Sequence, residues 1–124
     1  MSNDKKRVLD VGQCAPDHAA IRHFAESMGA QVTQVALPSE AITILEKESF
    51  DLVLVNRKID RDYSDGMELV RMMRNGNGKT KVPVMLISNF AEAQEQAVQE
   101  GAVPGFGKSE LGSARARELL QKYL

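Results

Sequence analysis

Two short, uninterrupted apolar runs constrain the fold of this chain more than any other feature. They are Leu52–Val55 and Val82–Ile87. A strand with one solvent-facing side alternates apolar and polar residues, whereas a strand buried on both sides is apolar throughout. Both runs therefore predict central strands of a sheet that is covered on both faces.

The rest of the chain alternates strand and helix patterns around these runs. Further strands are predicted at Val8–Val11, Gln31–Ala36 and, more weakly, Val103–Gly107. Helical spacing between the strands predicts inner helix faces made by Ile21, Phe24, Ala25 and Met28, by Ala41, Ile44 and Leu45, by Leu69, Val70 and Met73, and by Ala116, Leu119, Leu120 and Tyr123. Strands that alternate with helices of this length predict right-handed βαβ units in an α/β, doubly wound (βα)5 domain.

Local signals predict where the helices begin and end. Pro16-Asp17 opens the first helix and Gly29 ends it, and Pro38-Ser39-Glu40 opens the second. Asp65 is the expected N-cap of the third helix, Asn89 and Glu92 form the expected capping box of the fourth, and Gly101 ends it. The fifth helix is expected to start near Ser109 or Glu110, and residues 75–81 are expected to be a loop.

Length and charge exclude several functional classes. The 124 residues suit one domain spanning 1–124, and 17 acidic against 16 basic side chains argue against nucleic acid or an anionic membrane as a partner. Cys14 is the single cysteine, so neither an intrachain disulfide nor a multi-cysteine zinc site can form. No secretory signal or membrane span is recognisable, so we expect a cytoplasmic protein.

Ligand sites in open parallel sheets form beyond the carboxyl ends of the strands. The residues that follow the predicted strands are Gly12, Gln13, Cys14, Asn56, Arg57, Ser88, Asn89 and Lys108. We therefore expect any functional site of this domain to lie among them.

In this order and spacing, the motifs VLDV, FDLVLVN, DGMELVRMMR, VPVMLIS and EGA, with a lysine after the fifth strand, occur from Arg7 to Leu124. The chain thereby resembles the receiver domains of response regulators in two-component signal transduction, including the chemotaxis type. The resemblance implies a flavodoxin-like three-layer sandwich with strand order 2-1-3-4-5.

The resemblance also implies where phosphorylation chemistry would sit. A typical receiver has two acidic residues after strand 1 and a phosphoacceptor aspartate after strand 3, which together hold Mg²⁺, with Ser or Thr after strand 4 and Lys after strand 5. Here Gly12 and Gln13 align with the acidic pair and Asn56 with the acceptor, while Ser88 and Lys108 are retained. An amide nitrogen is a poor nucleophile, and Mg²⁺ favours carboxylate oxygens. We therefore expect an atypical receiver with a degenerate pocket, no metal, no cofactor and no enzymatic phosphotransfer.

Two departures from the family pattern concern spacing. Asp65-Gly66 lies nine and ten residues after Asn56, against seven and eight in the family, so we expect two inserted residues within 57–64. The aromatic switch position of the family falls on Gly105, and Phe106 could take that place only through a deletion or a bulge.

Family members signal through the face made by the fourth helix, the fifth strand and the fifth helix. Carried over, that face comprises Glu92, Gln96, Gln99, Phe106, Glu110, Arg115 and Glu118. The expected function is a phosphorylation-independent module that binds signalling proteins through this face, either constitutively or under the control of protein level or another ligand. A second copy of the chain, in a weak homodimer, is a further candidate partner.

Several alternatives stay open at this stage. Asp60 or Asp62, in a loop cluster with Asp65, could serve as a relocated phosphoacceptor. Ser88 and Lys108 could form an anion pocket with Asn56 and Gln13, although Lys108 donating to the Asn56 carbonyl oxygen is the favoured interpretation. Asp10 needs a pairing partner that the sequence does not name, and His18 and His23 are expected on the surface. Flavin or cobalamin binding is disfavoured because GQCAPD lacks their loop signatures.

Overall fold

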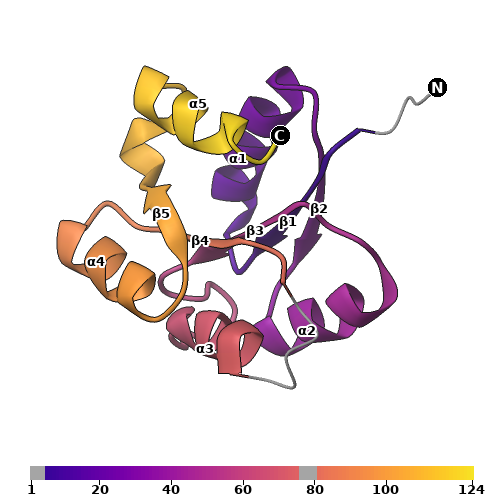
Figure 1. The fold of residues 1–124 in the computed structure, drawn as a ribbon, viewed down its shortest axis with the longest axis vertical. Coiled ribbons are helices and arrows are strands. Elements are labelled where there is room, and N and C mark those ends of the chain that lie inside the picture. The colour runs from indigo at the N-terminus through magenta and orange to yellow at the C-terminus, as the bar shows by residue number, and fades with distance from the viewer. Residues whose placement is uncertain (1–4, 76–80) are drawn as a thin grey trace.

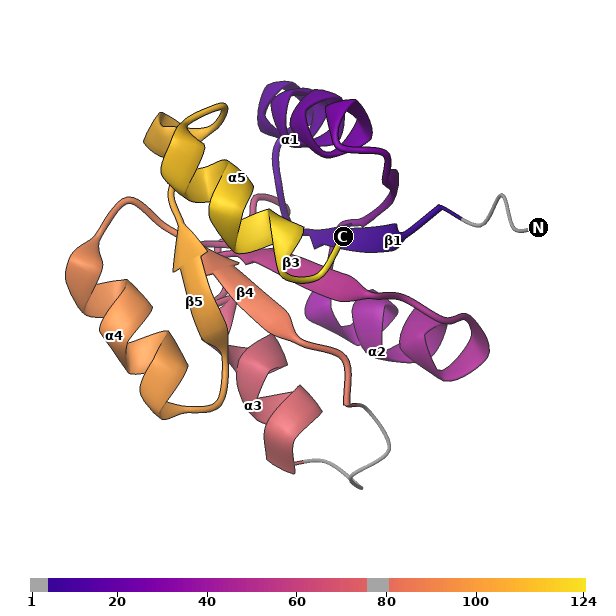
Figure 2. The same cartoon turned by 45° about the horizontal axis from the view of Figure 1, so that its top comes forward.

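Five parallel strands form a single sheet in the order β2-β1-β3-β4-β5. The computed structural model describes residues 5–75 and 81–124, and its strands are β1 (Arg7–Val11), β2 (Gln31–Val35), β3 (Leu52–Asn56), β4 (Val84–Ile87) and β5 (Val103–Phe106). Helices lie on both sides of this sheet (Figures 1 and 2). The predicted doubly wound (βα)5 architecture and its strand order are confirmed.

The helices divide between the two faces of the sheet. They are α1 (Ala15–Ser27), α2 (Pro38–Lys47), α3 (Met67–Asn75), α4 (Ala91–Gln99) and α5 (Ala114–Gln121). Helices α1 and α5 cover one face, and α2, α3 and α4 cover the other (Figure 1). Most of the predicted loop 75–81 lies outside the described residues, and among those described no helix is long and apolar enough to cross a membrane.

Each face of the sheet has its own hydrophobic core. Side chains of a strand point alternately to opposite faces, so Leu9 and Val11 pack under α2, α3 and α4, whereas Val8 packs under α1 and α5. The whole of Leu52–Val55 is fully buried, as the apolar run predicts. The predicted inner helix faces pack on the sheet, although some members are only partly buried: Met28, Ile44, Leu45, Leu119 and Tyr123.

Two predicted helix starts are wrong. Asn89 does not cap α4, because its Oδ1 accepts hydrogen bonds from the backbone N–H and the hydroxyl of Ser109, at 3.1 and 2.9 Å. The fifth helix begins at Ala114, where the Ser113 hydroxyl accepts from the Ala116 N–H, and Lys108–Glu110 forms a separate 3-10 turn. Serine is a strong N-cap, and Gly112 before it takes φ +85°, so the turn ends before the helix starts.

A bulge in β5 explains the position of Phe106. Met85 pairs with Val103 and Ile87 with Phe106, so two residues of β5, Pro104 and Gly105, oppose one residue of β4. Proline cannot donate to the ladder, which favours a bulge there. Phe106 is 1% exposed and packs edge-on against Phe24, with ring centroids 6.5 Å apart. It therefore belongs to the core under α1 and α5, and its expected place on an interaction face is wrong.

Candidate functional site

A hollow of about 350 Å³ lies at the carboxyl edge of the sheet. It brings together three of the five residues of the predicted degenerate pocket, Asn56, Ser88 and Lys108, from the ends of β3, β4 and β5. The other lining residues come from the end of β4, from the adjoining loops and from the start of α1: Cys14, Asp17, Arg57, Lys58, Asp60, Ile87, Asn89 and Phe90. The edge of the sheet therefore forms a hollow where the sequence predicts a site.

Gly12 does not border this hollow, because Ile59 covers it. Gly12 has φ +80°, and a Cβ placed there would lie 2.5 Å from Cδ1 of Ile59, which is fully buried. The Asp60 N–H also donates to the Gly12 carbonyl at 2.9 Å. The loop after β3 thus lays an apolar side chain against the end of β1, and a residue larger than glycine at position 12 would force the end of the Ile59 side chain to move.

Asn56 joins the loop after β1 to the loop after β3 through its side-chain amide. Its side-chain Nδ2 donates to the Gly12 carbonyl at 3.3 Å and to the Lys58 carbonyl at 2.7 Å. Both acceptors are carbonyl oxygens, so the amide nitrogen must face them. Asn56 therefore acts as a donor here, a role that a carboxylate cannot fill.

Lys108 is paired with a residue that the sequence did not suggest. Its Nζ lies 2.7 Å from Oδ2 of Asp17, on the first turn of α1, and not against the Asn56 carbonyl as the favoured interpretation had it. The hydrogen bond with Lys108 lowers the pKa of Asp17, so this carboxyl is ionised near neutral pH. Much of the lysine charge is thereby compensated within the protein.

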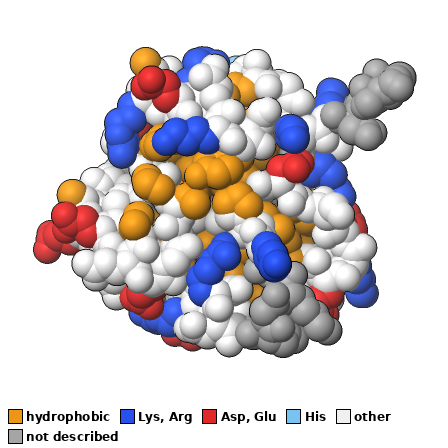
Figure 3. Space-filling model, in the orientation of Figure 1, with side chains coloured by type: hydrophobic (Ala, Val, Ile, Leu, Met, Phe, Trp, Pro, Cys, Tyr) orange, Lys and Arg blue, Asp and Glu red, His pale blue; other side chains and the backbone are white. Residues whose placement is uncertain are grey.

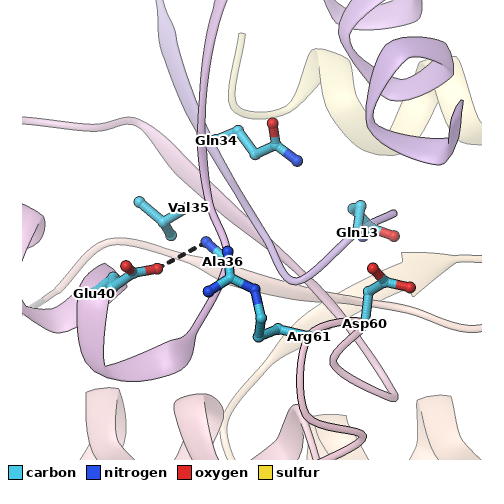
Figure 4. Close-up of a pocket in the computed structure, with 7 residues that line it drawn as sticks. All are labelled: Gln13, Gln34, Val35, Ala36, Glu40, Asp60 and Arg61. Atoms are coloured by element: carbon cyan, nitrogen blue, oxygen red, sulfur yellow. Dashed lines mark hydrogen bonds between the residues drawn. The ribbon is translucent and has the colours of Figure 1, made fainter. Parts of the chain in front are cut away.

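Gln13 lies beside a different hollow, of about 460 Å³, at the ends of β1 and β2. Figure 4 shows Gln13 and Asp60 on one side of it and Arg61 extending toward the end of β2. Gln13 is 5% exposed, and neither polar atom of its side chain has a hydrogen-bond partner among the described residues. The five residues of the predicted pocket therefore do not surround one cavity.

The partner of Asp10 is His18. Asp10 is fully buried on β1, and its Oδ2 lies 2.6 Å from Nδ1 of His18, whose side chain is 13% exposed. Burial raises the pKa of Asp10 to about 6, although the hydrogen bond and charge of His18 oppose this shift. The expected surface position of His18 is therefore wrong, while His23 is exposed as predicted.

Two of the three carboxylates in the loop after β3, those of Asp62 and Asp65, accept hydrogen bonds from nearby residues. Asp65 accepts from the Met67 N–H and from Arg57, both at 2.9 Å, so it caps the first turn of α3 as predicted. Asp62 accepts from the Ser64 hydroxyl at 2.6 Å, and that bond lowers the pKa of its exposed carboxyl. Asp60 borders both hollows.

The residues at this edge do not suit Mg²⁺. The Gly12 carbonyl already accepts two hydrogen bonds, and the amide nitrogen of Asn56 faces that same carbonyl. Across residues 5–75 and 81–124, no group of three or more His, Cys, Asp or Glu side chains is arranged to hold a metal ion. Mg²⁺ prefers a set of charged oxygen ligands, and of the two carboxylates that line the hollow of Asn56, Ser88 and Lys108, that of Asp17 is already paired with Lys108.

A third hollow, of about 430 Å³, lies between α4, β5 and α5. Of the seven residues predicted for the interaction face, Gln99 and Arg115 line it, and Glu92, Gln96 and Glu118 are exposed on the same helices. Glu110 is partly exposed and holds Arg115 through contacts of 2.8 and 2.9 Å. The sequence missed Gln94, Glu95, Val98 and Pro104 as lining residues.

Comparison with known proteins agrees with the geometry. The family model of the response regulator receiver domain matches residues 17–111. One similar solved structure is a receiver domain from Methylobacillus flagellatus, with 16% identity and a TM-score of 0.77, in which the match covers 98% of this chain and 100% of that chain. Another is the receiver domain of Klebsiella pneumoniae RstA, with 19% identity and a TM-score of 0.79, in which the match covers 95% of this chain and 97% of that chain. A third is the Vibrio cholerae chemotaxis response regulator CheY4, with 20% identity and a TM-score of 0.73, in which the match covers 98% of this chain and 100% of that chain.

At these identities the structural neighbours show a shared fold. No curated protein sequence matches the chain. The family model, however, covers most of the domain, from α1 to the turn before α5. The chain belongs to the response regulator receiver domain family.

Proposed function

We propose that this receiver domain lacks a phosphoacceptor and acts in two-component-type signalling as a phosphorylation-independent protein interaction module. The observation that carries the proposal is the donor role of Asn56, whose amide holds the Gly12 and Lys58 carbonyls. An amide in this position neither attacks phosphorus nor recruits a cation.

The surroundings of Asn56 support the same conclusion. Ile59 lies against Gly12, so a carboxylate side chain at position 12 would have to displace the Ile59 side chain. Lys108 is paired with Asp17, which reduces its ability to hold a phosphoryl oxygen. Without a phosphoryl trigger, partner binding would be constitutive or set by protein concentration.

The proposed binding face is that of α4, β5 and α5. Gln94 connects α4 to β4 and β5 through hydrogen bonds. Its amide nitrogen donates to the Leu86 carbonyl at 2.9 Å and to the Ser88 carbonyl at 3.2 Å, and its Oε1 accepts from the Gly105 N–H at 3.1 Å. A Cβ on Gly105 would lie 2.4 Å from the Leu86 carbonyl oxygen, so the position that the family uses for an aromatic switch admits no side chain. These contacts favour one fixed shape of the face.

Titration with beryllofluoride and Mg²⁺ tests the proposal. We expect the backbone amide resonances of residues Asn56 and Ser88 and of position 108 in ¹⁵N NMR spectra to stay unchanged on titration, in the wild type and in the Lys108→Ala variant alike. A saturable shift of these resonances that needs both reagents and is lost in Lys108→Ala would refute the proposal.

Asp60 supports a second candidate function, phosphorylation of a relocated carboxylate. Asp60 borders the hollow that Ser88 and Lys108 also line, whereas the Asp62 carboxylate is bonded to Ser64. In this case a carboxylate oxygen would attack the phosphorus of a phosphohistidine, and the imidazole would leave. Transfer from a histidine kinase that is lost in Asp60→Asn or in Asp62→Asn would support this function, and no transfer to the wild type would remove it.

A further inference from the structure

The hollow between α4, β5 and α5, called here the α4–α5 groove, has an apolar lining. It is bounded by Gln94, Glu95, Val98, Gln99, Pro104, Gly105 and Arg115. Val98 is 44% exposed although it is a large apolar residue, and Pro104 is exposed beside it. Figure 3 shows hydrophobic side chains between α4 and α5 and acidic side chains on the outer surface of α4. The groove can therefore take an apolar side chain from a partner.

Three glutamates of α4 and α5 lie on or near this groove, and one of them, Glu95, lines it. Glu92 and Glu95 stand three residues apart on α4 and so share one helix face, and Glu118 stands three residues after Arg115 on α5. None of these glutamates makes an ion pair with another described residue. Arg115 lies within the groove, but its guanidinium is held by Glu110 and donates to the Gly105 carbonyl. Three carboxylates at the rim are therefore open to a cationic partner.

The shape of the groove is fixed by contacts beneath it. Gln94 joins α4 to the last residues of β4 and to the bulge of β5, where Gly105 forms part of the groove. A pre-formed groove lowers the ordering cost of binding. This rigidity agrees with binding that needs no prior conformational signal.

We propose that the α4–α5 groove binds a cationic segment of a partner protein, which places an apolar side chain against Val98 and Lys or Arg side chains against Glu92, Glu95 and Glu118. This inference rests on the proposed function, since it names the partner chemistry of the same face. Opposite charges at the rim of an interface set specificity and association rate. A second copy of this chain would bring its own glutamates against these, and nucleic acid would bring phosphates, so both are disfavoured.

Two synthetic peptides test the charge requirement. One is an amphipathic helix with leucine anchors flanked by lysines, and the other has every lysine replaced by glutamate. We expect the cationic peptide to shift the ¹⁵N amide resonances of Val98, Gly105 and Arg115, with affinity that falls as salt is added. Binding of the acidic peptide with equal affinity, or shifts confined to other faces, would overturn the inference.

Matched variants locate the site. Glu95→Lys is expected to weaken binding of the cationic peptide roughly 3- to 10-fold, since one favourable charge contact becomes unfavourable. Glu46→Lys makes the same change of charge at an exposed position of α2 and should leave the affinity unchanged. Val98→Ser, at a half-exposed position that can tolerate it, should also weaken binding. Equal affinities for Glu95→Lys and Glu46→Lys would contradict the proposed site.

The two proposals fail in distinguishable ways. If beryllofluoride with Mg²⁺ shifts the Asn56 resonances, the phosphorylation-independent function is wrong, whatever the peptides do. If beryllofluoride has no effect and the cationic peptide does not bind, the partner chemistry alone is wrong.

Discussion

Asp10 of β1 and His18 of α1 form a buried pair, with the carboxylate oxygen 2.6 Å from the ring nitrogen. The other carboxylate oxygen of Asp10 has no hydrogen-bond partner among the described residues. The pair lies below the loop that carries Gly12, Gln13 and Cys14, and near Lys108, whose charge also lowers the pKa of Asp10. A buried ionisable pair makes the free energy of unfolding depend on pH in a defined direction.

The first prediction is that Asp10 makes the protein less stable as pH rises. The Asp10 carboxyl has a pKa of about 6 in the folded state against 3.8 as its ordinary value, so the folded protein binds this proton more tightly. Its stabilising contribution is complete below pH 3.8 and is lost as pH rises through 6. We expect the free energy of unfolding of the wild type, relative to Asp10→Asn, to fall by up to ~3 kcal/mol over this window. Urea unfolding at several pH values measures it, and parallel pH profiles would exclude the effect.

Removal of the histidine gives the second prediction. His18→Ala leaves a buried carboxylate without its partner, which costs about 3 kcal/mol of stability at neutral pH. The loss should shrink as pH falls toward 6, because without His18 the pKa of Asp10 rises further and the carboxyl takes up its proton at a higher pH than in the wild type. His23→Ala, at an exposed position of the same helix, should change stability by no more than about 0.5 kcal/mol. Equal losses for the two variants would show that the pair has no energetic role.

Gly12 and Gly29 provide the third prediction. Both have positive φ, +80° and +90°, but a Cβ at Gly12 meets Ile59, whereas one at Gly29 meets nothing within 4 Å. Gly29→Ala should therefore cost only the backbone penalty, about 1 kcal/mol, and Gly12→Ala roughly 2–4 kcal/mol. Thermal unfolding compares them. The added loss at Gly12 should diminish when Ile59→Ala is combined with it, and simple additivity would contradict the contact.

Asn56→Asp gives the fourth prediction. The new carboxylate would face the Gly12 and Lys58 carbonyl oxygens that now accept from the amide, at a cost of roughly 1–3 kcal/mol. Asn89→Asp is the matched control, because the Asn89 oxygen only accepts, from Ser109, and a carboxylate keeps both bonds. Chemical denaturation should separate the two variants clearly. An Asn56→Asp protein as stable as the wild type would rule out the donor role.

The fold was predictable because its signals are local and redundant. The apolar runs at β3 and β4 require a sheet covered on both faces, and helical spacing between strands fixes the parallel connections. The position of Asn56, Ser88 and Lys108 at one edge follows from that topology alone. Asp65 was recognisable as a cap because capping depends on residues close in sequence.

Contacts between elements were not predictable in the same way. Lys108 pairs with Asp17, and Asp10 pairs with His18. Both partners lie on α1, so both pairs depend on how α1 packs against the ends of the strands. The spacing of residues along α1 does not reveal how this helix packs against the sheet. The place of Phe106 likewise depends on the bulge at Pro104 and Gly105, which shifts the register of β5 against β4.

Intact mass spectrometry after incubation with acetyl phosphate and Mg²⁺ tests the central claim most directly. A receiver without a phosphoacceptor should show an unchanged mass at every time point, in the wild type and in Asp60→Asn and Asp62→Asn alike. A stable increase by one phosphoryl group, mapped to a carboxylate of the wild-type protein, would contradict the account.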